Sequence, residues 1–78
     1  MNKIIKFYKL DNEGLGYNPM YKFNSAEELR TAIQFKRDIP NENDMIAETW
    51  IDDNMISKNE PMVEVIEKLR LIGILWNK

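Results

Sequence analysis

The sequence contains neither cysteine nor histidine. Without cysteine, the protein has no disulfides, no thiol nucleophile and no thiolate metal site. Without histidine, it has no imidazole general base, no Ser-His catalytic arrangement and no histidine-ligated zinc or iron. These absences remove most of the side chains on which enzyme active sites depend. We therefore expect a protein that is not an enzyme and that requires no cofactor.

Long apolar runs are missing too. The longest, residues 71–76, is too short to span a bilayer, and no apolar stretch precedes a cleavage site near the N-terminus. We expect no membrane association and a cytoplasmic location. The 78 residues, 44% of them hydrophobic, suit one compact domain over residues 1–78 with a single core. The richness in Ile, Asn and Lys, with little Ala or Arg, is what AT-rich codons of a bacterial or phage gene produce.

Glycine is also scarce, with three in the chain. Two of them flank Leu15, but the position where a phosphate-binding loop needs a further glycine is Pro19, and no Gly-Lys-Ser/Thr ending follows. This segment, residues 11–16, is typical of the tip of a hairpin. It would join strands at residues 3–10 and 17–23.

The clearest periodic segment is residues 59–72. The apolar residues of one helical face are Met62, Val65, Ile66, Leu69 and Ile72. Their spacing predicts a core-facing helix, with Asn59 as N-cap, Pro61 in the first turn and Gly73 ending the helix in a left-handed conformation. Residues 74–76 would form a short terminal strand.

A second helix is predicted to begin after Ser25. Ser25 and Glu28 have the spacing of a capping box, in which each side chain binds the backbone amide of the other residue. The expected buried stripe is Ala26, Leu29, Ala32 and Ile33. Pro40 prevents the helix from continuing, so residues 38–43 should form a loop.

Residues 44–53 fit two structures, a strand or a helix. The strand is favoured by Thr49-Trp50-Ile51 and by a tight turn at residues 52–54. As a strand, it directs Met45, Ala47, Thr49 and Ile51 toward the core and Asp44, Ile46, Glu48, Trp50 and Asp52 outward. The expected fold is α+β, with the order β-hairpin, helix, β-hairpin, helix and short strand, and with both helices on one antiparallel or mixed sheet.

The net charge of −2 hides a strong asymmetry. Residues 1–24 carry a net charge of +2, whereas residues 39–64 carry seven acids and one lysine, a net charge of −6. The acids around Trp50 lack the central glycine of a calcium loop, and we predict no metal site there.

An outward tryptophan surrounded by charge is typical of a protein-binding hot spot. The partner-binding residues are predicted to be Asp44, Ile46, Glu48, Trp50, Asp52 and Asp53. The partner would be a larger protein, such as one with a basic groove that normally holds nucleic acid, and the role that of an inhibitor or adaptor from a phage or mobile element. If helices covered both sides of the strand, Trp50 would instead belong to the core.

Two further surfaces are candidates for binding. Aromatic and basic residues alternate in the first hairpin, which suits a single-stranded nucleic acid, and the set is Lys3, Lys6, Tyr8, Lys9, Tyr17, Tyr21 and Lys22. Lysine on an edge strand also serves to prevent aggregation. Val63 and Leu71 lie off the helical stripe, and Trp76 is two residues from the end of the sequence. These three residues would either close the core or form a homodimer contact.

Overall fold

The computed structural model describes residues 3–10 and 17–75. Its elements are β1 (Ile5–Leu10), β2 (Tyr17–Phe23), α1 (Ala26–Phe35), β3 (Met45–Ile51), β4 (Asn54–Pro61) and α2 (Met62–Leu71). The predicted α+β fold of two hairpins, each followed by a helix, is confirmed. Residues 44–53 form a strand rather than a helix.

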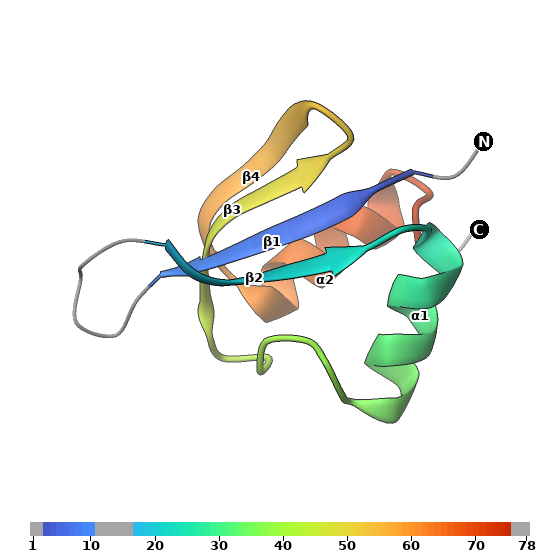
Figure 1. Ribbon diagram of the computed structural model, residues 1–78, viewed down its shortest axis with the longest axis horizontal. Coiled ribbons are helices and arrows are strands. Elements are labelled where there is room, and N and C mark those ends of the chain that lie inside the picture. The colour runs from blue at the N-terminus through green and yellow to red at the C-terminus, as the bar shows by residue number, and fades with distance from the viewer. Residues whose placement is uncertain (1–2, 11–16, 76–78) are drawn as a thin grey trace.

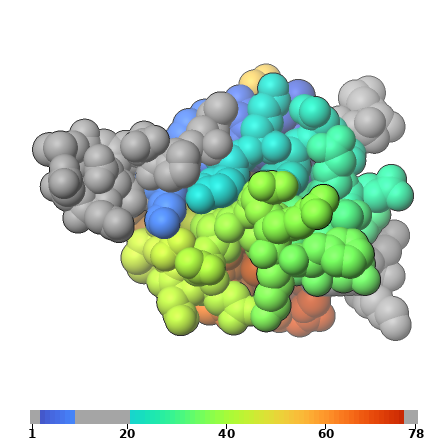
Figure 2. Space-filling view, turned by 60° about the horizontal axis from the view of Figure 1, so that its bottom comes forward, coloured from blue at the N-terminus to red at the C-terminus, as the bar shows by residue number. Residues whose placement is uncertain are grey.

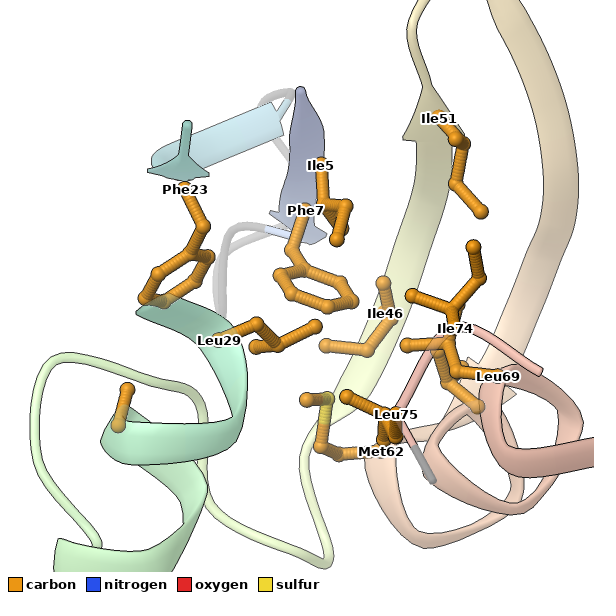
Figure 3. Packing of buried hydrophobic residues seen from close by; sticks show 12 residues of the cluster. Ile5, Phe7, Phe23, Leu29, Ile46, Ile51, Met62, Leu69, Ile74 and Leu75 are labelled. Carbon is orange, nitrogen blue, oxygen red and sulfur yellow. The ribbon is translucent and has the colours of Figure 1, made fainter. Parts of the chain in front are cut away.

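The four strands form one antiparallel sheet in the order β2-β1-β3-β4. The first strand of the chain is therefore central, and the connection through α1 carries the chain across β1 to reach β3 (Figure 1). Both helices lie on the same side of the sheet, and the apolar core fills the space between (Figure 3). Each of the two described helices has ten residues and is too short to span a membrane.

The buried apolar core takes side chains from β1, β2, β3 and both helices, and Ile56 of β4 packs against it. Its largest fully buried members are Ile5 and Phe7 of β1, Leu29 of α1, Ile46 of β3, Met62 and Leu69 of α2, and Leu75. The rings of Phe7 and Phe23 meet edge to face, with centroids 6.1 Å apart, so the first hairpin is joined across its strands (Figure 3).

Helix α1 begins as predicted. The Glu28 amide donates to Ser25 Oγ at 3.1 Å, which satisfies one of the free N–H groups of the first turn. The Glu28 carboxylate accepts from the amide of Asn24 rather than that of Ser25, at 3.2 Å. The helix ends at Lys36, which takes a left-handed conformation (φ 52°), and the Arg37 amide donates back to the Ala32 carbonyl at 3.1 Å.

The predicted start of α2 was wrong. Asn59 lies in β4 with φ 58°, and the helix begins after Pro61. No side chain caps it. Instead, the Met62 amide donates to the Asp44 carbonyl at 2.9 Å, and the Val63 amide donates to the Glu42 carbonyl at 3.1 Å. The loop before β3 therefore satisfies the free N–H groups of this helix.

The predicted end of α2 is confirmed. Gly73 has φ 84°, its amide donates to the Arg70 carbonyl, and the Ile74 amide donates to the Leu69 carbonyl at 3.0 Å. This pair of bonds is a Schellman motif, and burial of both Ile74 and Leu69 supplies its usual apolar contact.

The predicted strand at residues 74–76 is not formed over the two residues that are described, and Trp76 lies outside the described residues. Ile74 and Leu75 form a bend and are buried in the core. The Arg30 guanidinium of α1 donates to their carbonyl oxygens at 3.1 and 3.0 Å. These bonds take the place of a strand partner for the segment.

Strand β3 contains a bulge that changes which residues face the core. Tyr8 pairs with Glu48 and Lys9 pairs with Ile46, so Ala47 has no partner on β1. Ile46 and Ala47 are both buried, and Met45 is 45% exposed. The prediction that Ile46 points outward and Met45 inward was therefore wrong, whereas Ala47, Thr49 and Ile51 are buried as predicted.

Candidate functional site

The side of the sheet opposite the helices carries the candidate site. Because Ile5 and Phe7 point into the core, the alternate residues Lys6 and Tyr8 of β1 point to the other side. Strand pairing extends this surface to Lys22 on β2, Trp50 on β3 and the residues of β4 that oppose them. We call it the open face, and its residues are Lys6, Tyr8, Lys22, Glu48, Trp50, Met55 and Lys58.

Two aromatic residues occupy the centre of the open face. Tyr8 is on β1 and Trp50 is on β3, the two inner strands, and both are partly buried. The indole Nε1 of Trp50 donates to Glu48 Oε1 at 2.9 Å, which holds the ring in one orientation on the sheet. Trp50 is not part of the apolar core cluster. The sequence left its position open between core and surface, and the structure places it on the surface.

The basic residues of the open face form no ion pair with any acid that the structure describes. Lys6, Lys22 and Lys58 take part in none of the ion pairs formed among the described residues. Lys6 and Lys22 also lie directly opposite each other on β1 and β2. Like charges in that arrangement repel, so the pair opposes folding by a few tenths of a kcal/mol, about 0.2–1.

Acids of the segment 39–64 form ion pairs with lysines that lie outside this segment. Asp44 Oδ2 lies 3.0 Å from Lys9 Nζ, and Glu60 Oε1 lies 2.9 Å from Lys68 Nζ. The hydrogen bond from Lys9 lowers the pKa of Asp44 below its ordinary value. The hydrogen bond from Ser57, followed by that from Lys68, lowers the pKa of Glu60. The segment that is most acidic in the sequence is thus partly neutralised in the fold.

The predicted partner-binding residues are only partly brought together. Glu48 and Trp50 share the open face, while Ile46 is in the core and Asp44 is held by Lys9 and by the amide of Asn41. Asp52 lies at the end of the face, where its carboxylate accepts from the Ile4 amide at 3.0 Å. Asp53 is exposed in the turn between β3 and β4.

The residues predicted to bind nucleic acid also do not all lie on one surface. Lys6, Tyr8 and Lys22 lie on the open face, whereas Tyr21 packs against the core and Lys9 pairs with Asp44. The remaining members lie elsewhere: Lys3 beside the first turn of α1, and Tyr17 at the start of β2.

Sequence reasoning missed two members of the open face, Met55 and Lys58. They lie opposite Trp50 and Glu48 on β4. Counting from the turn at residues 52–53 places Met55 opposite Trp50, but the register shift between Thr49 and Trp50 is needed to place Lys58 opposite Glu48.

The helix side of the molecule carries a shallow groove of about 450 Å³ between the helices and the loop before β3. Figure 2 brings this loop forward, in yellow-green. The groove is lined mainly by Ile33, Ile39, Pro40 and Ile66, with Lys36, Glu42 and Asp44 at its polar end. Among residues 3–10 and 17–75, no three acids lie close enough to hold a metal ion.

The residues proposed for a homodimer are exposed where they are described. Val63 is 50% exposed and Leu71 is 71% exposed, on the outer side of α2, so neither closes the core. Their exposure leaves the homodimer a prediction. The third residue, Trp76, is outside the described part of the chain.

Comparison of the chain with protein-family models, with curated proteins and with solved structures found no match. The function must therefore be argued from the site itself.

Proposed function

We propose that the protein is a non-enzymatic module that binds another protein through the open face of its sheet, with Trp50 as the central anchor. The observation that carries this proposal is the Trp50–Glu48 hydrogen bond on a side of the sheet that neither helix covers. A tryptophan already fixed in position loses little conformational entropy on binding. Tryptophan and tyrosine are also the residues most enriched at interface hot spots.

The rest of the open face suits a protein partner. Lys6, Lys22 and Lys58 surround the aromatic pair with polar, hydrated groups, and Met55, 46% exposed, adds adaptable apolar surface beside Trp50. An aromatic centre with a polar rim is the usual composition of a protein interface. Residues of this type do not assemble a catalytic centre, because the described part of the face has one carboxylate, Glu48, and that group is bonded to Trp50.

An inhibitor or adaptor from a phage or mobile element is one role for such a module. A small protein of this kind would act by covering a site on a larger host protein. This role is an analogy that rests on size and composition, and identification of the partner decides it.

The experiment is site-specific photo-crosslinking. A benzophenone amino acid replaces Met55, which is exposed beside Trp50 on the open face. A matched variant carries the same group at Phe35, which is 63% exposed at the end of α1 on the helix side. Both are irradiated in nuclease-treated lysate of a low-GC bacterium. Crosslinking of one discrete protein at position 55 alone is expected, and Trp50→Ala should remove it.

Equal crosslinking from positions 55 and 35 would contradict the proposal, because the open face would then have no special role. A parallel lysate without nuclease tests the alternative ligand. If position 55 crosslinks to nucleic acid and to no protein, the function is instead single-strand binding by Tyr8, Trp50 and the lysines of the open face.

A further inference from the structure

We propose that the open face recognises an acidic segment of its protein partner, a conclusion that rests on the function proposed above. It differs from the basic partner that the acidic sequence segment suggests. The reason is the way in which the fold distributes hydrogen bonds and ion pairs over the two sides of the sheet.

Two carboxylates, one on the open face and one at its end, each already accept one hydrogen bond. Glu48 accepts from the Trp50 indole at 2.9 Å, and Asp52, at the end of the face, accepts from the Ile4 amide at 3.0 Å. Each keeps its second oxygen as an acceptor, but the three lysines of the face, Lys6, Lys22 and Lys58, outnumber these two carboxylates. A basic surface would therefore be repelled by the open face more than it is attracted.

The cations of the same face have no acidic partner in the described part of the chain. Lys6, Lys22 and Lys58 form no ion pair with the described residues, whereas Lys9, Lys36, Lys68 and Arg70 each have an acidic partner. The unpaired lysines come from three different strands and lie around Tyr8 and Trp50. A partner that places carboxylates over these lysines and an apolar residue over Trp50 complements both the charge and the shape of the face.

The Lys6–Lys22 pair adds an independent argument. These two lysines are opposite each other on adjacent strands, an arrangement that repels in the free protein. A carboxylate placed between them would convert this repulsion into two attractions. A substitution that removes the repulsion should therefore strengthen the fold and weaken binding, which separates a functional effect from a structural one.

The test uses fluorescein-labelled peptides of about 16 residues, all with the same Phe and Leu residues. The remaining positions are Asp/Glu in one peptide, Lys/Arg in the second and Ser/Gln in the third. Binding is measured by fluorescence anisotropy at about 50 and about 200 mM NaCl, concentrations that differ in electrostatic screening. An oligo-dT of similar length serves as a polyanion that is not a protein. The proteins are the wild type, Lys22→Glu, Trp50→Ala and Lys36→Glu.

Lys36→Glu is the matched control, because it makes the same change of charge at a side chain that is 81% exposed on the helix side. We expect the acidic peptide to bind the wild type and to bind about tenfold more weakly at the higher salt. Compared with the wild type, Lys22→Glu should lower the affinity for the acidic peptide by about tenfold or more, and Trp50→Ala should also lower it. Lys36→Glu should leave this affinity within about twofold of the wild type. The thermal midpoint of Lys22→Glu should be equal to or above that of the wild type.

Each other outcome overturns the inference. If the basic or neutral peptide binds best and Trp50→Ala weakens it, the partner is not acidic, although the proposed protein-binding function stands. If no peptide binds, or if Lys22→Glu changes the affinity by less than about twofold, the lysines do not select the ligand. If oligo-dT binds through Lys22 and Trp50 while the acidic peptide does not, both the inference and the protein-binding function fail in favour of nucleic acid.

Discussion

The two sides of the sheet differ in how fully their apolar side chains are buried and their charged side chains are paired. On the helix-covered side, Phe7, Ile46 and Leu69 are fully buried, and the ion pair Lys9–Asp44 links the sheet to the loop that caps α2. On the open face, two aromatic rings are partly exposed and three lysines have no acidic partner among the described residues.

This difference separates the residues that hold the fold together from those that we propose for recognition. A domain of this size has a single core and a stability of about 5 kcal/mol or a little more, so one side of the sheet must supply nearly all of the stabilising burial. The other side is then free to hold residues that are poor for folding, such as the opposed Lys6 and Lys22. Substitutions on the two sides of the sheet should therefore differ in their effect on the free energy of unfolding.

The largest effect is expected from Phe7→Ala on the helix-covered side. Phe7 is fully buried and meets Phe23 edge to face, so its removal leaves a cavity and breaks an aromatic pair. The cost should be about 3–5 kcal/mol, enough to unfold much of the population at room temperature. Urea unfolding followed by far-ultraviolet circular dichroism measures it. A loss below about 1 kcal/mol would show that the core is not where the stability resides.

A gain is expected from Thr49→Val on the same side. Thr49 is fully buried, and its hydroxyl has no hydrogen-bond partner among the described residues. Valine has nearly the same shape without the polar group, so the free energy of unfolding should rise by about 1–2 kcal/mol. The midpoint of thermal unfolding reports the change. A decrease would mean that the hydroxyl has a partner after all.

Lys36→Gly should stabilise the end of α1 by a smaller amount, about 0.5–1 kcal/mol. Lys36 has φ 52°, a conformation that costs most residues energy and glycine little. The ion pair lost with it, to Glu42 at 4.0 Å, is exposed and weak. Urea unfolding of this variant beside the wild type is the test, and a destabilised variant would show that the side chain matters more than the backbone conformation.

An effect of similar size concerns Asp44 and pH. The folded state lowers the pKa of Asp44 and of Glu60, chiefly through hydrogen bonds from Lys9 and from Ser57. A lowered pKa adds stability above the ordinary values of 3.8 and 4.5, and this stability is lost as the pH falls through the folded-state values. The thermal midpoint should therefore be flat from pH 7 to about 5 and fall below about pH 4.5.

Asp44→Asn is the control for that profile. It removes the partner of Lys9 and should cost about 0.5–1 kcal/mol at pH 7. Its midpoint should then fall less steeply between pH 4 and 3 than that of the wild type, because one of the titrating groups is gone. Parallel profiles for both proteins would show that the Lys9–Asp44 pair contributes no measurable stability.

Local signals in the sequence predicted the parts of the fold that local contacts determine. The Ser25 cap, the Gly73 terminus and the turn at residues 52–53 each depend on residues within a few positions of one another. The start of α2 was not predictable in this way, because the carbonyls that bind its first amides belong to Glu42 and Asp44, about twenty residues earlier.

The candidate site was predicted in part for the same reason. Trp50 and Glu48 were placed together by simple alternation, and alternation failed at Ile46 because the bulge at Ala47 shifts the register. The net charge counted along the sequence does not give the charge of the open face, because it ignores pairing across the fold, such as Lys9 with Asp44. Neither bulges nor distant ion pairs leave a clear pattern in one sequence.

The most direct test of the division between the two sides is the urea unfolding of Trp50→Ala. If Trp50 serves recognition, its truncation should cost less than about 2 kcal/mol, with an unchanged dependence on urea, because the ring is partly exposed and lies outside the core cluster. A loss of about 3 kcal/mol or more, comparable to that of Phe7→Ala, would contradict this account and make Trp50 a structural residue.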